Sequence, residues 1–364
     1  MTIGAIMAHL EAYAPRAYQE SYDNTGLLTG SATWEARQAL VTLDCTEAVV
    51  DEAIREGANL IIAHHPIIFK GVKSLTGRNY VERTLIKAIK HDIAIYAIHT
   101  NLDNVAKGVS HRMAAALGLK NVRILRPLSQ SLQKLTTFVP PADTERVLAA
   151  LHQAGAGRIG NYSACSFRVE GTGTFLPGES AMPTVGQRGQ LESVTEHRVE
   201  VLFPAAAQHA VMAALRRAHP YEEVAFYIHH LENENQDAGS GVIGELDRET
   251  STLEVLGNLK AAFKTGCVRH TAILKPRVKT IAMCGGAGSF LLPRAIQAGA
   301  DLFVSADFKY HEFFDADGLI TIADIGHYES EQYTKDLLAE VLREKFPTFA
   351  VNFSKTITNP ISYL

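Results

Sequence analysis

The sequence feature that most constrains this chain is an apolar run that ends in two adjacent histidines and a proline, residues 61–66 (IIAHHP). It predicts a buried strand with a polar carboxyl end, which is where open α/β sheets place their ligands. Because neighbouring side chains of a strand point to opposite faces, His64 and His65 can share one site only where the chain leaves the strand. Pro66 is suited to end the strand there.

Two further clusters combine histidine with a carboxylate. His99 follows an apolar run and stands four residues before Asp103. His327 and Glu331 are also four residues apart, at the start of a helical pattern, and therefore lie on one helix face. Histidines with carboxylates and no cysteine are typical of a metal site with nitrogen and oxygen ligands.

Each cluster also has a purely structural interpretation. A histidine pair at a strand end is more often structural than metal-binding, and His327 with Glu331 can form a solvated pair in the first turn of a helix. The metal interpretation gains weight because three such clusters each follow an apolar strand directly.

Composition excludes several classes of protein. The 364 residues, 46% hydrophobic and 20% charged, are typical of a globular protein with two or three domains. A net charge of −4 without a basic block argues against a dedicated nucleic-acid surface. Four scattered cysteines without a CxxC pair fit a reducing compartment. The absence of a signal-peptide pattern and of a membrane-length apolar run predicts a cytoplasmic protein.

The order of predicted strands and helices divides the chain into three parts. Residues 1–127 and 233–364 alternate strands with helices and are expected to be α/β, whereas residues 128–232 read strand–helix–strand twice and predict a ferredoxin-like α+β module. Within these parts, residues 171–175 are expected to form a tight glycine turn and residues 232–241 a polar linker without packing residues. A closing helix is expected from about residue 327 to 345.

An internal repeat relates the first and third parts. Residues 57–60 (GANL) match residues 299–302 (GADL), and each match follows a strand and a helix of the same length. The next strand in each part ends near a histidine that precedes a carboxylate by four residues. Any two βαβ units look alike to some degree, but we favour a duplication. The predicted fold is therefore α/β, with two similar repeats forming one metal-binding core that a ferredoxin-like insert interrupts.

Six motifs resemble a known family: DNTGLL at 23–28, AHHP at 63–66, HTNLD at 99–103, CGGAGS at 284–289, DFKYHE at 307–312 and GHYESE at 326–331. Over essentially its full length the chain resembles the GTP cyclohydrolase 1 type 2 homologues, the NIF-three-like dinuclear metal proteins. Tyr22 stands where that family tends to have tryptophan, a difference that concerns packing. The insert is similar to the trimeric copper-tolerance and P-II signalling proteins.

The resemblance implies a ring-shaped homohexamer that holds two divalent metal ions per chain, with Glu331 bridging them. The nitrogen and oxygen ligands admit Zn, Mn, Fe, Co or Ni. The ligands that the resemblance implies are His64, His65, Asp103, His327 and Glu331.

Such a pair of ions commonly activates a water for attack on a carbonyl, phosphoryl or amidine carbon. We therefore expect a metal-dependent hydrolase that acts on a nucleotide-like or phosphorylated small molecule. His99 and His311 are candidates for proton transfer, and each can equally be a core or solvent-facing histidine. Residues 285–289 can bind an anion or form a tight turn between strand and helix. The alternative function is a non-enzymatic metal-binding hexamer that acts as a regulator, scaffold or metallochaperone.

Overall fold

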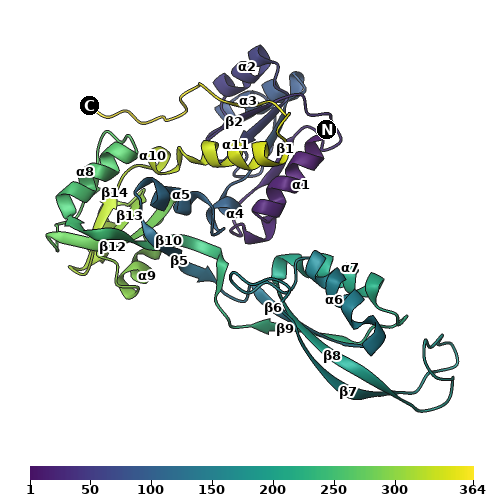
Figure 1. Ribbon diagram of the computed structural model, residues 1–364. Helices are drawn as coiled ribbons and strands as arrows, with labels where there is room; N and C mark the ends of the chain where they lie inside the picture. Colours follow the sequence, from purple (N-terminus) through teal and green to yellow (C-terminus); the bar gives the residue numbers. More distant parts are fainter. The chain divides into compact units, whose positions relative to one another are not determined.

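The computed structural model describes all 364 residues, which form two compact units (Figure 1). Residues Met1–Pro127 and Asp237–Leu364 together make the first, called the core unit here, and residues Leu128–Gln236 make the second, the inserted unit. The first and third parts of the sequence therefore share one unit. No helix combines the length and apolar character needed to cross a bilayer.

The first sheet of the core unit has five strands in the order β1-β4-β3-β2-β15. Strands β2, β3, β4 and β15 are parallel to their neighbours, whereas β1 pairs with β4 in the antiparallel sense. Their apolar residues are buried on both faces, as is typical of parallel sheets covered by helices. The bounds are β1 Gly26–Thr29, β2 Ala39–Thr42, β3 Leu60–Ala63, β4 Ala94–Ala97 and β15 Val351–Phe353.

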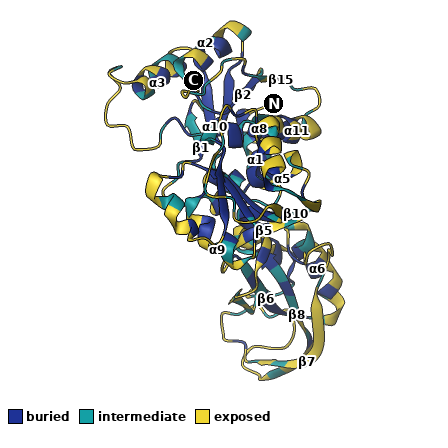
Figure 2. Ribbon diagram, turned by 90° about the vertical axis from the view of Figure 1, so that its left-hand side faces the viewer, coloured by how far each residue is buried: buried dark blue, intermediate teal, exposed yellow.

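Alternate residues of these strands pack against different helices. Val41, Ile62 and Tyr96 share a buried cluster with helices α1 (Ile3–Tyr13) and α11 (Thr334–Lys345). The intervening residues Leu40, Ile61 and Ile95 pack against α2 (Glu47–Glu56) and α3 (Tyr80–Lys90) instead. This two-residue period makes a three-layer sandwich, and Figure 2 shows its buried strands between helices with exposed outer faces.

The second sheet has six strands in the order β11-β14-β13-β12-β10-β5. Strands β12, β13 and β14 are parallel, and β10 and β11 flank them in the antiparallel sense. Helices α5 (Val109–Ala116) and α8 (Thr252–Ala262) pack against one face, and α9 (Leu292–Gln297) against the other. The strand bounds are β5 Lys120–Leu128, β10 Asn235–Ser251, β11 Arg269–His270, β12 Arg277–Ala287, β13 Leu302–Ala306 and β14 Thr321–Asp324.

The two sheets share local details at the matched residues. Gly57 and Gly299 each end a helix with φ of 75°, a conformation that glycine adopts without strain. Asn59 accepts a hydrogen bond of 2.8 Å from the backbone N–H of Arg37, and Asp301 accepts one of 2.9 Å from that of Lys279. In both sheets the matched residue thus ties the start of one parallel strand to the start of the next.

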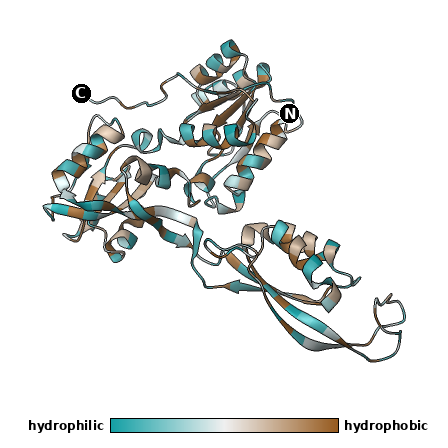
Figure 3. Ribbon diagram, in the orientation of Figure 1, coloured by the Kyte–Doolittle hydropathy of each residue, from teal (hydrophilic) through white to brown (hydrophobic).

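The inserted unit has one antiparallel sheet in the order β7-β8-β6-β9. Helices α6 (Thr144–Gln153) and α7 (Gln208–Ala218) pack together with its buried side chains in one cluster. This order of strands and helices is the ferredoxin-like arrangement, as expected. Figure 3 shows apolar residues alternating with polar ones along the long strands. The bounds are β6 Leu132–Val139, β7 Phe167–Phe175, β8 Glu192–Pro204 and β9 Phe226–Leu231.

Two local predictions around the insert were wrong. Residues 171–175 form no tight turn but continue β7 in register with β8. A Cβ at Gly173 would lie 2.2 Å from the Glu196 carboxylate, so a larger residue there would displace that side chain. Residues 232–241 are not an unpacked linker either, since β10 begins at Asn235 and Ala238 is fully buried. Both predictions were based on the glycine-rich or polar composition of these residues. Pairing with neighbouring strands of a sheet nevertheless places residues of both segments in a strand.

The predicted closing helix is two helices, α10 (His327–Glu331) and α11, rather than one. At the break, the side chains of Gln332 and Tyr333 donate hydrogen bonds to backbone carbonyls of Phe263 and Ala262. These carbonyls lie at the carboxyl end of α8, where a helix leaves acceptors unpaired. The residues between α10 and α11 are therefore hydrogen-bonded to α8, which packs against the second sheet.

A buried carboxylate holds the carboxyl-terminal segment against α2. Glu52 is 3% exposed and accepts hydrogen bonds from the Ser354 hydroxyl (2.6 Å), the Lys355 N–H (2.7 Å) and the Thr356 hydroxyl (2.7 Å). Burial by itself raises the pKa of Glu52, but these hydrogen bonds outweigh it and lower that pKa to about 2.

Glu52→Gln is expected to lower the free energy of unfolding by about 1–3 kcal/mol at neutral pH, since hydrogen bonds to the charged carboxylate are lost. The pKa of Glu52 is about 2 in the folded protein and 4.5 in the unfolded chain. The ionised carboxylate therefore stabilises the fold fully above pH 4.5, and this stabilisation is lost as the pH falls toward about 2. The difference between the two proteins should therefore vanish over that window. Urea unfolding followed by fluorescence of Trp34, the single tryptophan, measures it. Glu56→Gln is the matched control, and an equal loss in both variants would contradict the assignment.

Candidate metal centre

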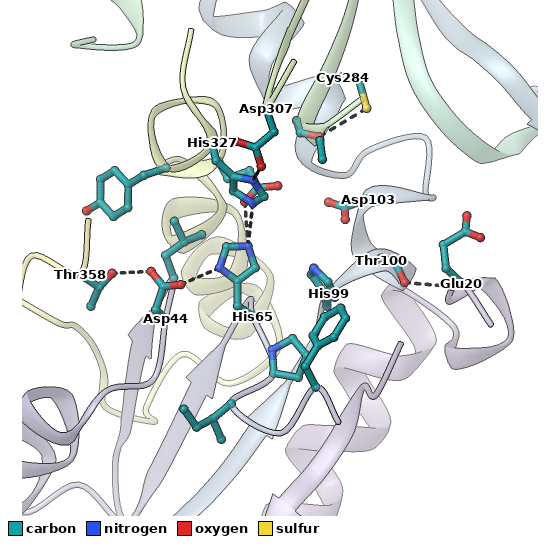
Figure 4. A pocket seen from close by; sticks show the side chains of 18 of the residues that line it. Glu20, Asp44, His65, His99, Thr100, Asp103, Cys284, Asp307, His327 and Thr358 are labelled. Atoms are coloured by element: carbon teal, nitrogen blue, oxygen red, sulfur yellow. Dashed lines mark hydrogen bonds and ion pairs between the residues drawn. The ribbon is translucent and has the colours of Figure 1, made fainter. Parts of the chain in front are cut away.

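The predicted site residues lie where strands of the two sheets end. His64 and His65 follow β3, and His99 follows β4 and precedes a short helix α4 (Thr100–Asp103). His327 and Glu331 are the first and last residues of α10, which follows β14. All of them except His64, which is fully buried, border one cavity of about 750 Å³ within the core unit. Figure 4 labels His65, His99 and His327 in this cavity.

The ligand atoms of these residues converge in three overlapping groups. Within each group, all candidate ligand atoms lie within 4.8 Å of one another. The structure therefore brings together every metal ligand predicted from the sequence, and it adds His99 to them. The groups are His64 with His65 and His99, His65 with His327 and Glu331, and His64 with Asp103 and Glu331.

The two carboxylate oxygens of Glu331 face different partners. Its Oε2 lies 2.9 Å from Nε2 of His65 and 3.1 Å from Nε2 of His327. Its Oε1 lies 3.9 Å from Nε2 of His64, which is itself 3.6 Å from Oδ1 of Asp103. The carboxylate thus stands between two groups of donors, which is the position that a bridging ligand requires.

Each of the four imidazoles is oriented by an acceptor at its Nδ1 atom. A carbonyl or carboxylate oxygen can only accept, so Nδ1–H is the donor and Nε2 carries the lone pair of the neutral ring. Metal-binding histidines are usually held in this way by a second hydrogen bond. The pairs are His64 with the Ile98 carbonyl (2.8 Å), His65 with Asp44 (2.7 Å), His99 with Asp23 (2.8 Å) and His327 with Asp307 (2.7 Å).

Two buried atoms of the cluster have no hydrogen-bond partner. They are Nε2 of His64 and Oδ1 of Asp103, which face each other at a distance too long for a hydrogen bond. Leaving such a group unsatisfied costs about 1–3 kcal/mol, so native proteins rarely do so without a function. A divalent cation would satisfy both atoms at once, and the donor set therefore fits a metal centre.

The electrostatics of the cluster depend on Glu331. Burial lowers the pKa of His64 to about 4, so this ring is neutral. Burial also opposes charge on His65 and His327, but their carboxylate partners outweigh it and raise the pKa values to about 10 and about 11. Burial and the nearby Glu331 carboxylate raise the pKa of Asp103. Protonated His65 and His327 supply the positive charge that a cation would otherwise provide, so cation binding must displace these protons.

Residues 285–289 support the centre from the side of β12. Gly286 has φ of 59°, and a Cβ there would lie 2.3 Å from Oε1 of Glu331. Its N–H donates to the Ser330 hydroxyl (2.9 Å), and the N–H of Gly285 donates to that of Ser110 (3.3 Å). The N–H groups of Gly285 and Gly286 are therefore used within the protein, and this part of the segment packs closely against Glu331.

The two candidate catalytic histidines have different surroundings. His99 lies in the cavity, with its ring centroid 5.3 Å from those of both His64 and His65. His311 is exposed outside the cavity, where its ring packs against Tyr310 and Phe314. The solvent-facing interpretation is therefore correct for His311.

Sequence reasoning missed the three carboxylates that orient the imidazoles. Asp307 directly follows strand β13, Asp44 lies two residues after the end of β2, and Asp23 precedes β1. A signal was present, because Asp307 and Asp44 lie at the carboxyl ends of their strands in the same positions as His64 and His65 at the end of β3. Their partners, however, come from other strands, and pairing across strands cannot be read from spacing.

The comparisons with known proteins cover the whole chain. The family model Duf34/NIF3 (NGG1p interacting factor 3) matches residues 1–360. A Halalkalibacterium halodurans protein named GTP cyclohydrolase 1 type 2 homolog is 40% identical over 97% of this chain and 96% of its own length. A Bacillus subtilis protein of the same name is 39% identical over 99% and 98%, respectively. The crystal structure of a Bacillus cereus protein related to NIF3 aligns with a TM-score of 0.88 at 38% identity, covering 100% of this chain and 99% of that one.

The inserted unit has a weaker likeness. The CutA structure from Synechococcus elongatus aligns with 29% of this chain and 81% of its own, at 15% identity and a TM-score of 0.22. A similarity at that level supports no argument, so the ferredoxin-like assignment of the insert depends on its strand order alone.

Asp44→Ala is expected to weaken metal binding about 10–100-fold, because His65 loses the acceptor that orients its ring. Competition with a chromophoric chelator measures the affinity. Asp51→Ala, which removes a surface carboxylate from α2 that pairs with Lys87, should leave the affinity unchanged. Equal affinities in the native protein and in Asp44→Ala would show that the Asp44 contact does not support the centre.

Proposed function

Since this chain belongs to the Duf34/NIF3 family, we propose that it is a dinuclear metal protein that hydrolyses a nucleotide-like or phosphorylated small molecule. The observation that carries the proposal is the position of Glu331, whose two oxygens face two separate groups of buried donors. His65 and His327 would hold one divalent ion with Oε2, and His64 and Asp103 the other with Oε1. Zn, Mn, Fe, Co and Ni all suit these donors.

Two divalent ions held in this way supply Lewis acidity and lower the pKa of a water. The protein's own residues supply orientation and a proton-transfer group. His99 presents Nε2 toward the cluster while Nδ1 donates to Asp23, whose second oxygen accepts from the N–H of Thr100 (3.0 Å). Burial raises the pKa of Asp23, but bonds from His99 and Thr100 outweigh it and lower that pKa to about 2. The ionised Asp23 therefore fixes the orientation of the His99 ring, which a proton-transfer group requires.

The centre depends on both parts of the core unit. Three of the proposed ligands belong to residues 1–127 and two to residues 237–364. We infer that these parts descend from one duplicated α/β unit, which the shared strand order and the matched contacts of Asn59 and Asp301 support. Binding of the ions across the two sheets would then stabilise their packing.

A second candidate function is a non-enzymatic metal-binding homohexamer that acts as a regulator, scaffold or metallochaperone. The observation in its favour is the inserted unit, which contributes none of the residues that line the cavity. A separately folded module of about a hundred residues without a role in the site is typical of a regulatory or assembly function.

Gently purified protein is expected to contain about two divalent ions per chain. His64→Ala and Glu331→Ala should each lower this content without unfolding the protein, because they remove donors from one or both groups. Elemental analysis together with circular dichroism measures both quantities. His311→Ala changes a histidine outside the cavity and serves as the control. Full metal content in both ligand variants would refute the assignment.

The metal-loaded protein is expected to hydrolyse a member of a broad panel of nucleosides, nucleotides and phosphoesters. His99→Ala should retain metal but turn over about 10²–10⁴-fold more slowly, since it loses a proton-transfer group. Glu331→Ala should lose both metal and activity. No turnover of any panel member by protein that carries two ions would instead favour the non-enzymatic function.

A further inference from the structure

The cavity beside the metal centre has a one-sided charge distribution. Five carboxylates line it, and no lysine or arginine does. Asp23 adds a sixth carboxylate behind His99. With neutral imidazoles, these six negative charges exceed the four positive charges of two divalent ions by two. The lining carboxylates are Glu20, Asp44, Asp103, Asp307 and Glu331.

Arg269 acts electrostatically on the lining carboxylate Asp307, but neither it nor Lys70 or Lys73 lines the cavity. Arg269 donates to the Asp324 carboxylate and to the Phe308 carbonyl. Lys70 and Lys73 lie on the exposed loop that follows Phe69 and do not line the cavity. Sites that bind phosphate usually place arginine, lysine or several free N–H groups around it. A phosphorylated ligand would find only the metal ions here, within a surplus of negative charge.

The mouth of the cavity carries exposed aromatic side chains. Tyr22, Phe69 and Tyr80 line it although 62%, 49% and 60% of their surfaces are exposed. The rings of Tyr22 and Phe69 lie 6.3 Å apart at an angle of 34°, and the Phe69 ring meets that of His99 edge-on at 5.9 Å. Large aromatic side chains left exposed beside a cavity are typical of a stacking surface for a planar ligand.

We propose that this site takes an uncharged or cationic planar nitrogen heterocycle, such as a nucleobase or nucleoside, and discriminates against phosphorylated ligands. The inference rests on the proposed function, because it concerns the same cavity, and it narrows the substrate class to its uncharged members. The heterocycle stacks on the aromatic mouth while its polar edge faces the metal centre. The surplus of carboxylates repels phosphate groups and tolerates positive charge.

The test compares each of four nucleosides (adenosine, guanosine, cytidine and uridine) with its 5′-monophosphate. Monophosphates are preferable to triphosphates, which can strip metal from the protein. Equilibrium dialysis against metal-loaded protein measures binding without requiring turnover, and elemental analysis afterwards verifies the metal. At least one nucleoside should bind tenfold or more tightly than its monophosphate. The ratio should shrink when salt rises from about 0.05 M to about 0.5 M, since screening weakens the repulsion.

Two matched variants connect the preference to the cavity. Glu20→Gln removes one lining charge but keeps an acceptor for the Asn104 amide. It should lower the ratio of nucleoside affinity to monophosphate affinity about threefold. Glu249→Gln removes the same charge from an exposed position on β10 outside the cavity and should leave the ratio unchanged.

Three results would overturn the inference: tighter binding of the monophosphates, loss of monophosphate binding in a Lys70→Ala/Lys73→Ala variant, and no detectable binding of any nucleoside at millimolar concentration. The first two would leave the proposed hydrolase intact with a phosphorylated substrate. The proposed function itself fails separately, through absent metal or absent turnover across the panel.

Discussion

The core unit is organised around one buried carboxylate, Glu331, between imidazoles from both sheets. It is 3% exposed, and its two oxygens face nitrogen donors that follow β3 and β14. A charged group that is removed from water in this way requires compensating charge, or it destabilises the fold. Protonated His65 and His327 compensate it in the metal-free protein, and divalent cations would do so in the loaded one. The same residue therefore governs both the packing of the two sheets and the chemistry of the cavity.

Neighbouring elements are shaped to leave room for Glu331 and to hold its partners. Gly286 lacks the Cβ that would collide with the carboxylate, and Ser330 receives a hydrogen bond from the same glycine. Asp44, Asp23 and Asp307 each fix an imidazole through Nδ1. Preorganisation of this kind reduces the reorganisation that a bound ligand would require. The same arrangement gathers five carboxylates around the cavity, and the proposed preference for ligands without phosphate rests on this charge.

The inserted unit and the metal centre are built on different principles. The insert buries one continuous apolar cluster beneath its two helices and holds no residue of the cavity. At the centre of the core unit, Nε2 of His64 and Oδ1 of Asp103 are buried and unpaired, 3.6 Å from each other. Unsatisfied groups of this kind are tolerated where function requires them. The proposed metal-dependent function therefore rests on residues of the core unit alone.

Local patterns in the sequence were sufficient to predict the strand–helix alternation, the match of residues 57–60 with 299–302 and the histidines and carboxylates that converge around Glu331. Those features depend on neighbours within a few residues, or on motifs that resemble a family. The sequence did not reveal that residues 235–251 form a long strand, because their polar composition is compensated by the position of β10 between β12 and β5 in the sheet. It also did not reveal which carboxylate orients which histidine, or that His311 lies away from the cavity. Only the tertiary structure decided these points, since hydrogen bonds and burial between distant segments depend on how the sheets pack and not on spacing along the chain.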